Sequence, residues 1–85
     1  MAILSKEVIL EDDTWTLISA RGFIGQKGNG DVIYIVNADA VPADMHVPEA
    51  MTYGDTDKLY FLAPAAGSFY AKSRTGTTTL AFYEV

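Results

Sequence analysis

The chain has 85 residues and a mass of 9.2 kDa, which suits one small hydrophobic core and leaves no room for a second. Hydrophobic residues make up 49% of the chain and charged residues 20%, which excludes the low hydropathy and high charge of a disordered segment. Eleven acidic and six basic residues give a net charge of −5, which argues against nucleic acid as the main partner because nucleic-acid binders present a basic face. The lack of cysteine excludes a disulfide scaffold, a thiolate metal site and a cysteine nucleophile.

We expect residues 1–85 to form a single β domain, with residues 1–5 as an N-terminal arm. The first residues lack the charged and then apolar pattern of a secretory signal. The longest apolar run, 32–36, is far shorter than the roughly 20 residues that span a bilayer. We therefore expect no membrane partner.

Hydrophobic periodicity predicts β-strands along most of the chain. A short opening strand is predicted over 6–10, followed by a strand over 14–19 in which Trp15 and Leu17 share one face. Trp15 is expected in the core. Residues 31–36 are a continuous β-branched and aromatic run, which predicts a central strand covered on both faces.

Three further alternating runs predict strands over 58–63, 68–73 and 77–85. Phe61, Phe69 and Phe82 take the core-facing positions of these strands. Tyr60 and Tyr70 have the opposite parity, so they are expected on the outside or under a second covering layer.

Two segments interrupt the strand pattern. Residues 25–31 are rich in glycine and carry an Asn-Gly pair that suits positive φ, which predicts a tight hairpin turn. Residues 37–57 show no clean period, and their prolines exclude a central strand. We interpret 37–57 as a long loop with a short edge strand around 45–47 and one helical turn over 48–51. Long loops in compact domains are often functional.

Short strands separated by turns predict an all-β fold, a small antiparallel β-sandwich or jelly-roll-like barrel with one long proline-containing loop. A domain of this size without disulfides or a structural metal is commonly supported by oligomerisation. Self-association is therefore expected.

Little in the sequence indicates chemistry. His46 is the single histidine, and although Asp44 and Glu49 are near it in sequence, no serine nucleophile motif accompanies them. The glycine-rich turn is followed by a strand, and Lys27 is not followed by Ser or Thr, so it does not fit a phosphate loop. We expect no enzymatic activity, no cofactor and no metal.

Two acidic segments leave an alternative open. Residues 11–13 and the pair Asp55 and Asp57 could supply oxygen ligands to Ca²⁺, separately or as one site. Both are more typical of solvated turns, because the later bidentate glutamate of a calcium loop is missing after Asp57.

The candidates for a partner interface are methionine, histidine and tyrosine side chains in the long loop and on the outward strand positions. They are Met45, His46, Met51, Tyr53, Tyr60 and Tyr70. Tyrosine contributes a large contact area at low entropic cost, in a protein interface or in a platform that stacks on sugars. The alternative function is therefore a carbohydrate-binding β-sandwich that uses Tyr53, Tyr60 or Tyr70 near Asp55 and Asp57.

The order of these features resembles that of small β-sandwich virion proteins of tailed bacteriophages, such as head-decoration or cement proteins and fibre modules. The similarity covers about residues 14–85: a tryptophan strand, a glycine turn, a central strand, a proline-containing loop and a threonine-rich closing strand. It includes no diagnostic motif, and the loop 37–57 is longer and more acidic than in that group. The resemblance implies a structural protein located in the virion that forms homo-oligomers, often trimers, and binds other virion proteins.

Overall fold

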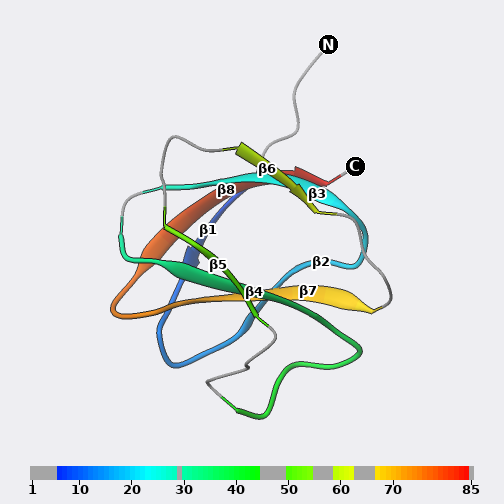
Figure 1. The fold of residues 1–85 in the computed structure, drawn as a ribbon, viewed down its shortest axis with the longest axis horizontal. Coiled ribbons are helices and arrows are strands. Elements are labelled where there is room, and N and C mark those ends of the chain that lie inside the picture. The colour runs from blue at the N-terminus through cyan, green and yellow to red at the C-terminus, as the bar shows by residue number, and fades with distance from the viewer. Residues whose placement is uncertain (1–5, 29, 45–49, 55–58, 63–66, 85) are drawn as a thin grey trace.

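A computed structural model describes residues 6–28, 30–44, 50–54, 59–62 and 67–84 (Figure 1), and the structural statements below concern these residues. At Met51, Tyr53 and Leu59–Leu62 only the backbone is described. The predicted N-terminal arm, the predicted strand 45–47 and the acidic pair Asp55 and Asp57 lie outside the described residues.

The described residues form eight β-strands and no helix. The strands are β1 (Lys6–Leu10), β2 (Thr16–Ser19), β3 (Phe23–Lys27), β4 (Ile33–Ala38), β5 (Met51–Tyr53), β6 (Leu59–Leu62), β7 (Ser68–Ser73) and β8 (Thr78–Glu84). They build two antiparallel four-stranded sheets, sheet A with the order β1-β8-β3-β6 and sheet B with the order β2-β7-β4-β5. This is the double-sheet arrangement of an eight-stranded jelly roll. The predicted all-β sandwich is confirmed.

The two sheets lie face to face, as Figure 1 shows with sheet A above sheet B. Phe23 of sheet A is fully buried and meets Phe69 of sheet B edge-to-face, with ring centroids 5.2 Å apart. It meets Phe82 of its own sheet in the same way at 5.8 Å. The other buried members of the core are Leu10, Ile18, Ile33, Ile35, Ala71 and Leu80.

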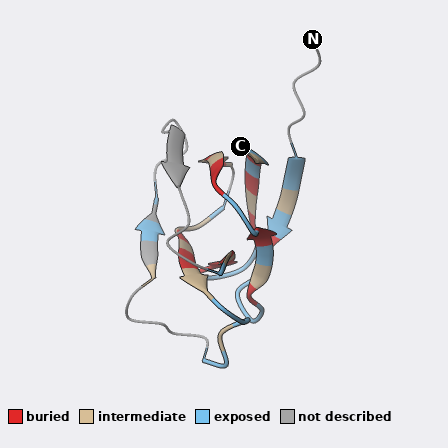
Figure 2. Cartoon of the chain, turned by 90° about the vertical axis from the view of Figure 1, so that its right-hand side faces the viewer, coloured by how far each residue is buried: buried red, intermediate tan, exposed pale blue. Residues whose placement is uncertain are grey.

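Strand alternation was predicted correctly where the pattern is long. Buried and exposed residues alternate along β8, where Leu80 and Phe82 face the core and Ala81 and Tyr83 are exposed (Figure 2). In β4, Ile33 and Ile35 are fully buried in the core and Val36 is buried on the opposite face. β4 is therefore a central strand covered on both faces, as predicted.

The predicted hairpin at 25–31 is wrong. Residues 23–27 form β3, and β3 pairs with β6 and β8 while β4 belongs to the other sheet, so the segment crosses between sheets. Gly30 does have a positive φ, 130°, and a Cβ there would lie 2.6 Å from backbone atoms of Thr77 and Thr78. The glycine-rich pattern correctly predicted a residue with positive φ. This residue lies where the chain passes from sheet A to sheet B, close to the backbone of β8.

Trp15 is buried, as predicted, but it lies on the outer side of sheet B and not between the two sheets. Thr16 pairs with the core residue Ala71, and Leu17 pairs with Tyr70, so Trp15 and Leu17 face outward and Leu17 is 58% exposed. The register of β2 against β7 shifts only after Leu17. Trp15 precedes β2 and is buried, but it does not belong to the core cluster. Trp15 and Leu17 share a face as predicted, and that face is the outer one.

The long loop contains a short edge strand, β5, at Met51–Tyr53, and the predicted strand around 45–47 is not tested because those residues are not described. β5 pairs with β4 through Ile33↔Tyr53 and Ile35↔Met51 and forms the edge of sheet B. The helical turn predicted over 48–51 is therefore wrong at Met51, because pairing with β4 satisfies backbone groups there that a lone helical turn would leave open.

Candidate interaction surfaces

The predicted interface residues are only partly described. Met45 and His46 lie outside the described residues, and of Met51, Tyr53 and Tyr60 only the backbone is described. Met51 and Tyr53 lie on the edge strand of sheet B, whereas Tyr60 lies on the edge strand of sheet A. Tyr70 lies on β7 and is half-buried.

In register, Tyr60 pairs with Gly25 and Phe61 pairs with Ile24. Gly25 in turn pairs with the core residue Phe82 across β3 and β8. The Cα register therefore places Tyr60 in the row of Gly25 and Phe82, and the side chains of β6 are not described.

The outer face of sheet B carries a row of aromatic and cationic side chains. Along β7, Ala71 faces the core, so its neighbour Lys72 projects to the outer face, where it pairs in register with Tyr34 of β4. The Lys72 ammonium lies 5.2 Å from the Tyr34 ring centroid and 5.9 Å from that of Trp15. It also donates a hydrogen bond to the Ser73 carbonyl at 3.0 Å. Two aromatic faces and one carbonyl therefore stabilise a lysine that is only 5% exposed.

The chain itself covers this row. The Trp15 indole N–H donates a hydrogen bond of 2.8 Å to the carbonyl of Asp44, which fixes the segment 39–44 to the start of β2. Figure 1 shows 39–44 on the outer side of sheet B. We name the part of the outer side of sheet B that contains Trp15, Tyr34, Val36 and Lys72 the covered face; Leu17, on the same side of the sheet, is outside it and is exposed. Sequence analysis missed the covered face, although a buried tryptophan usually requires a partner for its N–H.

The outer side of sheet A is different. Residues 7 and 9 of β1, 24 and 26 of β3, and 79, 81 and 83 of β8 occupy its outward positions, because the residues between them face the core. Ile9 is 62% exposed and Tyr83 is 39% exposed. No described segment lies outside this sheet in the way that 39–44 lies outside sheet B (Figure 1). We name these seven positions the open face.

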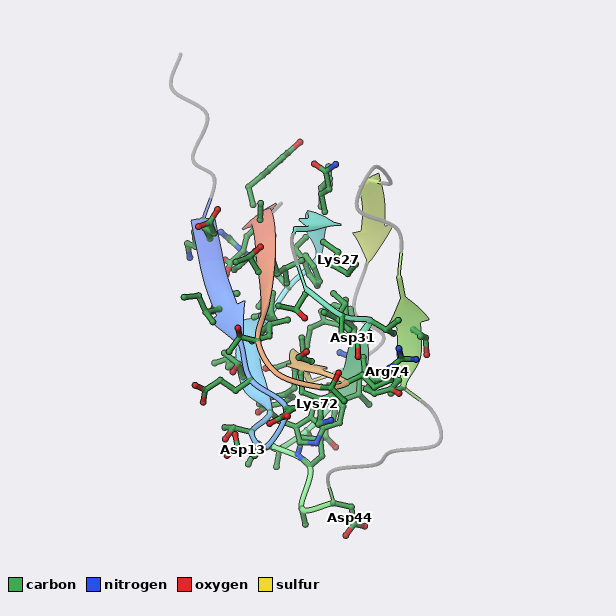
Figure 3. All side chains as sticks on the ribbon, turned by 90° about the vertical axis from the view of Figure 1, so that its left-hand side faces the viewer. Asp13, Lys27, Asp31, Asp44, Lys72 and Arg74 are labelled. Atoms are coloured by element: carbon green, nitrogen blue, oxygen red, sulfur yellow. The ribbon has the colours of Figure 1, made fainter. Side chains whose placement is uncertain are left out.

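One end of the sandwich is tied by hydrogen bonds between turns. The Asp31 carboxylate accepts hydrogen bonds from Arg74 Nε at 2.9 Å, from Arg74 Nη2 at 2.7 Å and from the Thr75 hydroxyl (Figure 3). The hydrogen bonds from Arg74 and Thr75 hold the pKa of Asp31 well below its ordinary range, and the same pair raises the pKa of Arg74. Behind them, the buried hydroxyls of Ser73 and Thr78 lie 2.8 Å apart.

The acidic turn 11–13 also makes hydrogen bonds at this end of the sandwich. Asp12 accepts a hydrogen bond of 2.8 Å from the Gly76 N–H, and Asp13 accepts one of 3.1 Å from the Thr14 hydroxyl. Within the described ranges no group of three or more His, Cys, Asp or Glu is placed to hold a metal ion. Asp12 and Asp13 therefore bond within the turns at this end, and Asp55 and Asp57, the other half of the calcium alternative, lie outside the described residues.

Lys27 has a structural role in the crossing. Its side chain is buried, and its ammonium donates to the carbonyls of Gly28 at 3.0 Å and Gly30 at 3.4 Å. The Lys27 ammonium therefore binds carbonyls of the glycine-rich segment itself, and the segment is followed by a strand, β4. This arrangement agrees with the rejection of a phosphate loop.

Comparison with known protein families, curated proteins and solved structures gave no match for this chain. The described part of the chain contains no helix long and apolar enough to cross a membrane. The functional conclusion therefore rests on the fold and on the contrast between the covered and open faces.

Proposed function

We propose that the protein is a non-enzymatic structural module that assembles with copies of itself in a virion, as a capsid decoration, cement or fibre-associated protein. The order of the sequence features supports a virion role, and so does the jelly roll, which viral capsid domains share with lectins and cupins. Because one fold serves many functions, the fold by itself has little weight.

The open face carries the proposal. It presents Ile9, Ala81 and Tyr83 on rigid strands, and Glu7 is the one carboxylate or cationic residue among its seven positions. Exposed apolar side chains gathered on one face of a sheet are a feature of protein interaction sites. Burial of this face would also stabilise a domain that is too small to bury much of its own surface.

The first test is the mass of the protein in solution, measured by light scattering after size exclusion over a concentration series. We expect a closed homo-oligomer. A monomer at every concentration would contradict the proposal. The second test is co-sedimentation with purified capsid shells, in which the protein is expected in the pellet. Protein that stays in the supernatant at every shell concentration would remove the virion role.

A carbohydrate-binding module is the alternative, because lectins also use the jelly roll. Of its predicted stacking residues, Tyr70 is half-buried in β7, and the side chains of Tyr53 and Tyr60 are not described. A glycan array with and without calcium discriminates between the two functions. Binding that a Tyr70→Ala variant abolishes, by a protein that stays monomeric, would replace the structural proposal.

A further inference from the structure

We infer that the covered face is a closed binding site for a sugar acid, in which Lys72 binds the carboxylate and the segment 39–44 blocks access as an autoinhibitory strap. This inference goes beyond the proposed function and does not depend on it, because it uses the other sheet. We name 39–44 the strap. Trp15 holds its end through the hydrogen bond of 2.8 Å to the Asp44 carbonyl, and Figure 1 shows it on the outer side of sheet B.

Lys72 is a buried cation whose hydrogen-bonding capacity is only partly used. An ammonium has three donors, and that of Lys72, a residue only 5% exposed, donates to the Ser73 carbonyl at 3.0 Å. Among the residues that the structure describes, no ion pair joins Lys72 to a carboxylate. The other buried lysine, Lys27, donates to two carbonyls of its own segment. Because burial of a cation without a counter-ion is costly, an anion that reaches Lys72 gains a strong partner.

The surroundings of Lys72 determine which anion fits. The rings of Tyr34 and Trp15 lie 5.2 and 5.9 Å from the ammonium, so two flat apolar surfaces flank one cation. Aromatic surfaces with a single well-placed polar group are the usual lining of a small-molecule site. A sugar acid has the matching chemistry, because it carries a carboxylate on a rigid ring whose C–H groups form an apolar face. An acidic peptide has the carboxylate without that ring.

The strap is fixed at its start and at its end and is exposed between them. At the start the chain packs tightly, because a Cβ at Gly67, where φ is 69°, would lie 2.4 Å from the Ala38 carbonyl oxygen. Five of the six strap residues are exposed, and Val41, its largest apolar residue, is 58% exposed. The strap therefore buries little apolar surface of its own, and segments of this kind open locally at low cost. Loss of the Trp15 hydrogen bond frees the end of the strap while its start stays in place.

The charge of the strap makes it a competitor of an external anion. It carries two carboxylates, Asp39 and Asp44, and no lysine or arginine, so an acidic segment lies over a buried cation. Figure 3 shows the Asp44 side chain directed away from the sandwich, so this carboxylate attracts Lys72 without binding it. A ligand that brings a carboxylate into direct contact with Lys72 binds the open state alone. Its apparent affinity is reduced by the fraction of molecules that are closed.

The test measures binding of glucuronate by isothermal titration calorimetry, with glucose as the ring that lacks a carboxylate. Lys72→Met removes the cation and keeps an apolar side chain of similar length. Lys6→Met is the matched control, because it removes the same charge from a side chain that is 62% exposed on β1. Trp15→Phe keeps a ring and releases the strap. Thermal unfolding shows whether each variant is folded, and hydrogen exchange of the amides in 39–44, with and without glucuronate, follows the strap.

We expect glucuronate to bind and glucose not to bind. The dissociation constant of glucuronate should rise at least about tenfold in Lys72→Met, stay unchanged in Lys6→Met and fall in Trp15→Phe, where more molecules are open. Glucuronate should also make exchange in 39–44 faster in the wild type, because it binds the open state. This measurement needs no variant, so it keeps the test valid if Lys72→Met fails to fold.

Four results would overturn parts of the inference. Absence of glucuronate binding in both the wild type and Trp15→Phe overturns the site. An equal loss of binding in Lys6→Met and Lys72→Met overturns the role of Lys72, and binding that leaves exchange in 39–44 unchanged overturns the strap. Tighter binding of tetraglutamate than of glucuronate replaces the sugar acid with an acidic peptide. The mass of the protein in solution is measured separately, so failure here leaves the proposed function standing.

Discussion

The two outer faces of the sandwich show how one strand pattern can lead to different surfaces. Along β7 and along β8 alternate residues face the core, so both strands direct a second row of side chains outward. The outward row of sheet B contains Lys72 and Tyr34 and lies beneath 39–44, which Trp15 holds through the Asp44 carbonyl. The outward row of sheet A contains Ala81 and has no such cover in the described ranges. The alternation of side chains along a strand determines which residues face away from the core. A loop from elsewhere in the chain determines whether those residues are exposed to solvent.

The largest expected effect comes from the core that both faces share. Phe23→Ala removes a fully buried ring with two edge-to-face neighbours and should cost about 3–5 kcal/mol of the free energy of unfolding. Small domains have only about 5–15 kcal/mol in total, so little stability would remain. Urea unfolding followed by Trp15 fluorescence and by far-UV circular dichroism should show both signals shift together. Ile24→Ala, one residue further and half-buried on the open face, is the control and should cost less. Signals that shift separately would show that the two faces do not share one core.

The second-largest effect is expected from a substitution that disturbs the covered face and leaves the open face unchanged. Trp15→Phe keeps a ring beside Lys72 but removes the indole N–H that binds Asp44, and should cost about 1–3 kcal/mol. Hydrogen exchange of the amides in 39–44 should become faster, while the amides of β8 stay protected. Leu17→Ala, on the same side of sheet B and exposed, should leave exchange in 39–44 unchanged. Equal exchange in the wild type and Trp15→Phe would mean that the hydrogen bond does not hold the segment.

A third effect concerns the end of the sandwich, where the turns of both sheets meet. The folded pKa of Asp31 lies below its ordinary value of 3.8, so the unfolded chain takes up a proton there at higher pH than the folded protein does. The contribution of Asp31 to stability is therefore complete at neutral pH and is lost as the pH falls below 3.8. Asp31→Asn should have a lower Tm than the wild type at neutral pH, and this difference should shrink as the solution is acidified.

The control for this pH series is Asp13→Asn. It removes a carboxylate that bonds the neighbouring Thr14 and keeps the pair between Asp31 and Arg74. If Asp13→Asn shows the same loss of Tm and the same dependence on pH, the effect comes from net charge and not from the Arg74 pair.

The smallest effect on stability is expected on the open face. Ile9→Thr keeps a β-branched residue in β1 and should change the free energy of unfolding by no more than about 0.5 kcal/mol, because the side chain is 62% exposed. Leu10→Ala, one residue further and fully buried, should cost about 2–5 kcal/mol. Urea denaturation at low protein concentration measures both. A large loss in Ile9→Thr would mean that the face is already covered in the single chain.

The candidate interface was only partly predictable from the sequence. Parity predicted Tyr70 to lie outside the core, and the structure confirms it. Parity also put Trp15 in the core, because it cannot distinguish a residue beneath a loop from one between the sheets. Lys27 and Lys72 are buried charged residues, and hydropathy gives no signal for a lysine that binds carbonyls or stacks on rings. The open face was missed because Ile9 and Ala81 are ordinary strand residues whose exposure depends on what lies over them.

The sequence by itself determined the all-β class, the central strand β4 and the alternation of β7 and β8, because side-chain direction in a strand repeats every two residues. Only the tertiary structure decided which strands pair. Of the six strand pairs among the described residues, β4 with β5 alone joins strands that follow each other in the chain, so hairpin signals such as the glycine turn could not reveal the register. Pairing depends on how two sheets enclose one core, which is a property of the whole chain. The same holds for the two outer faces, because residues far away in the sequence determine what covers each of them.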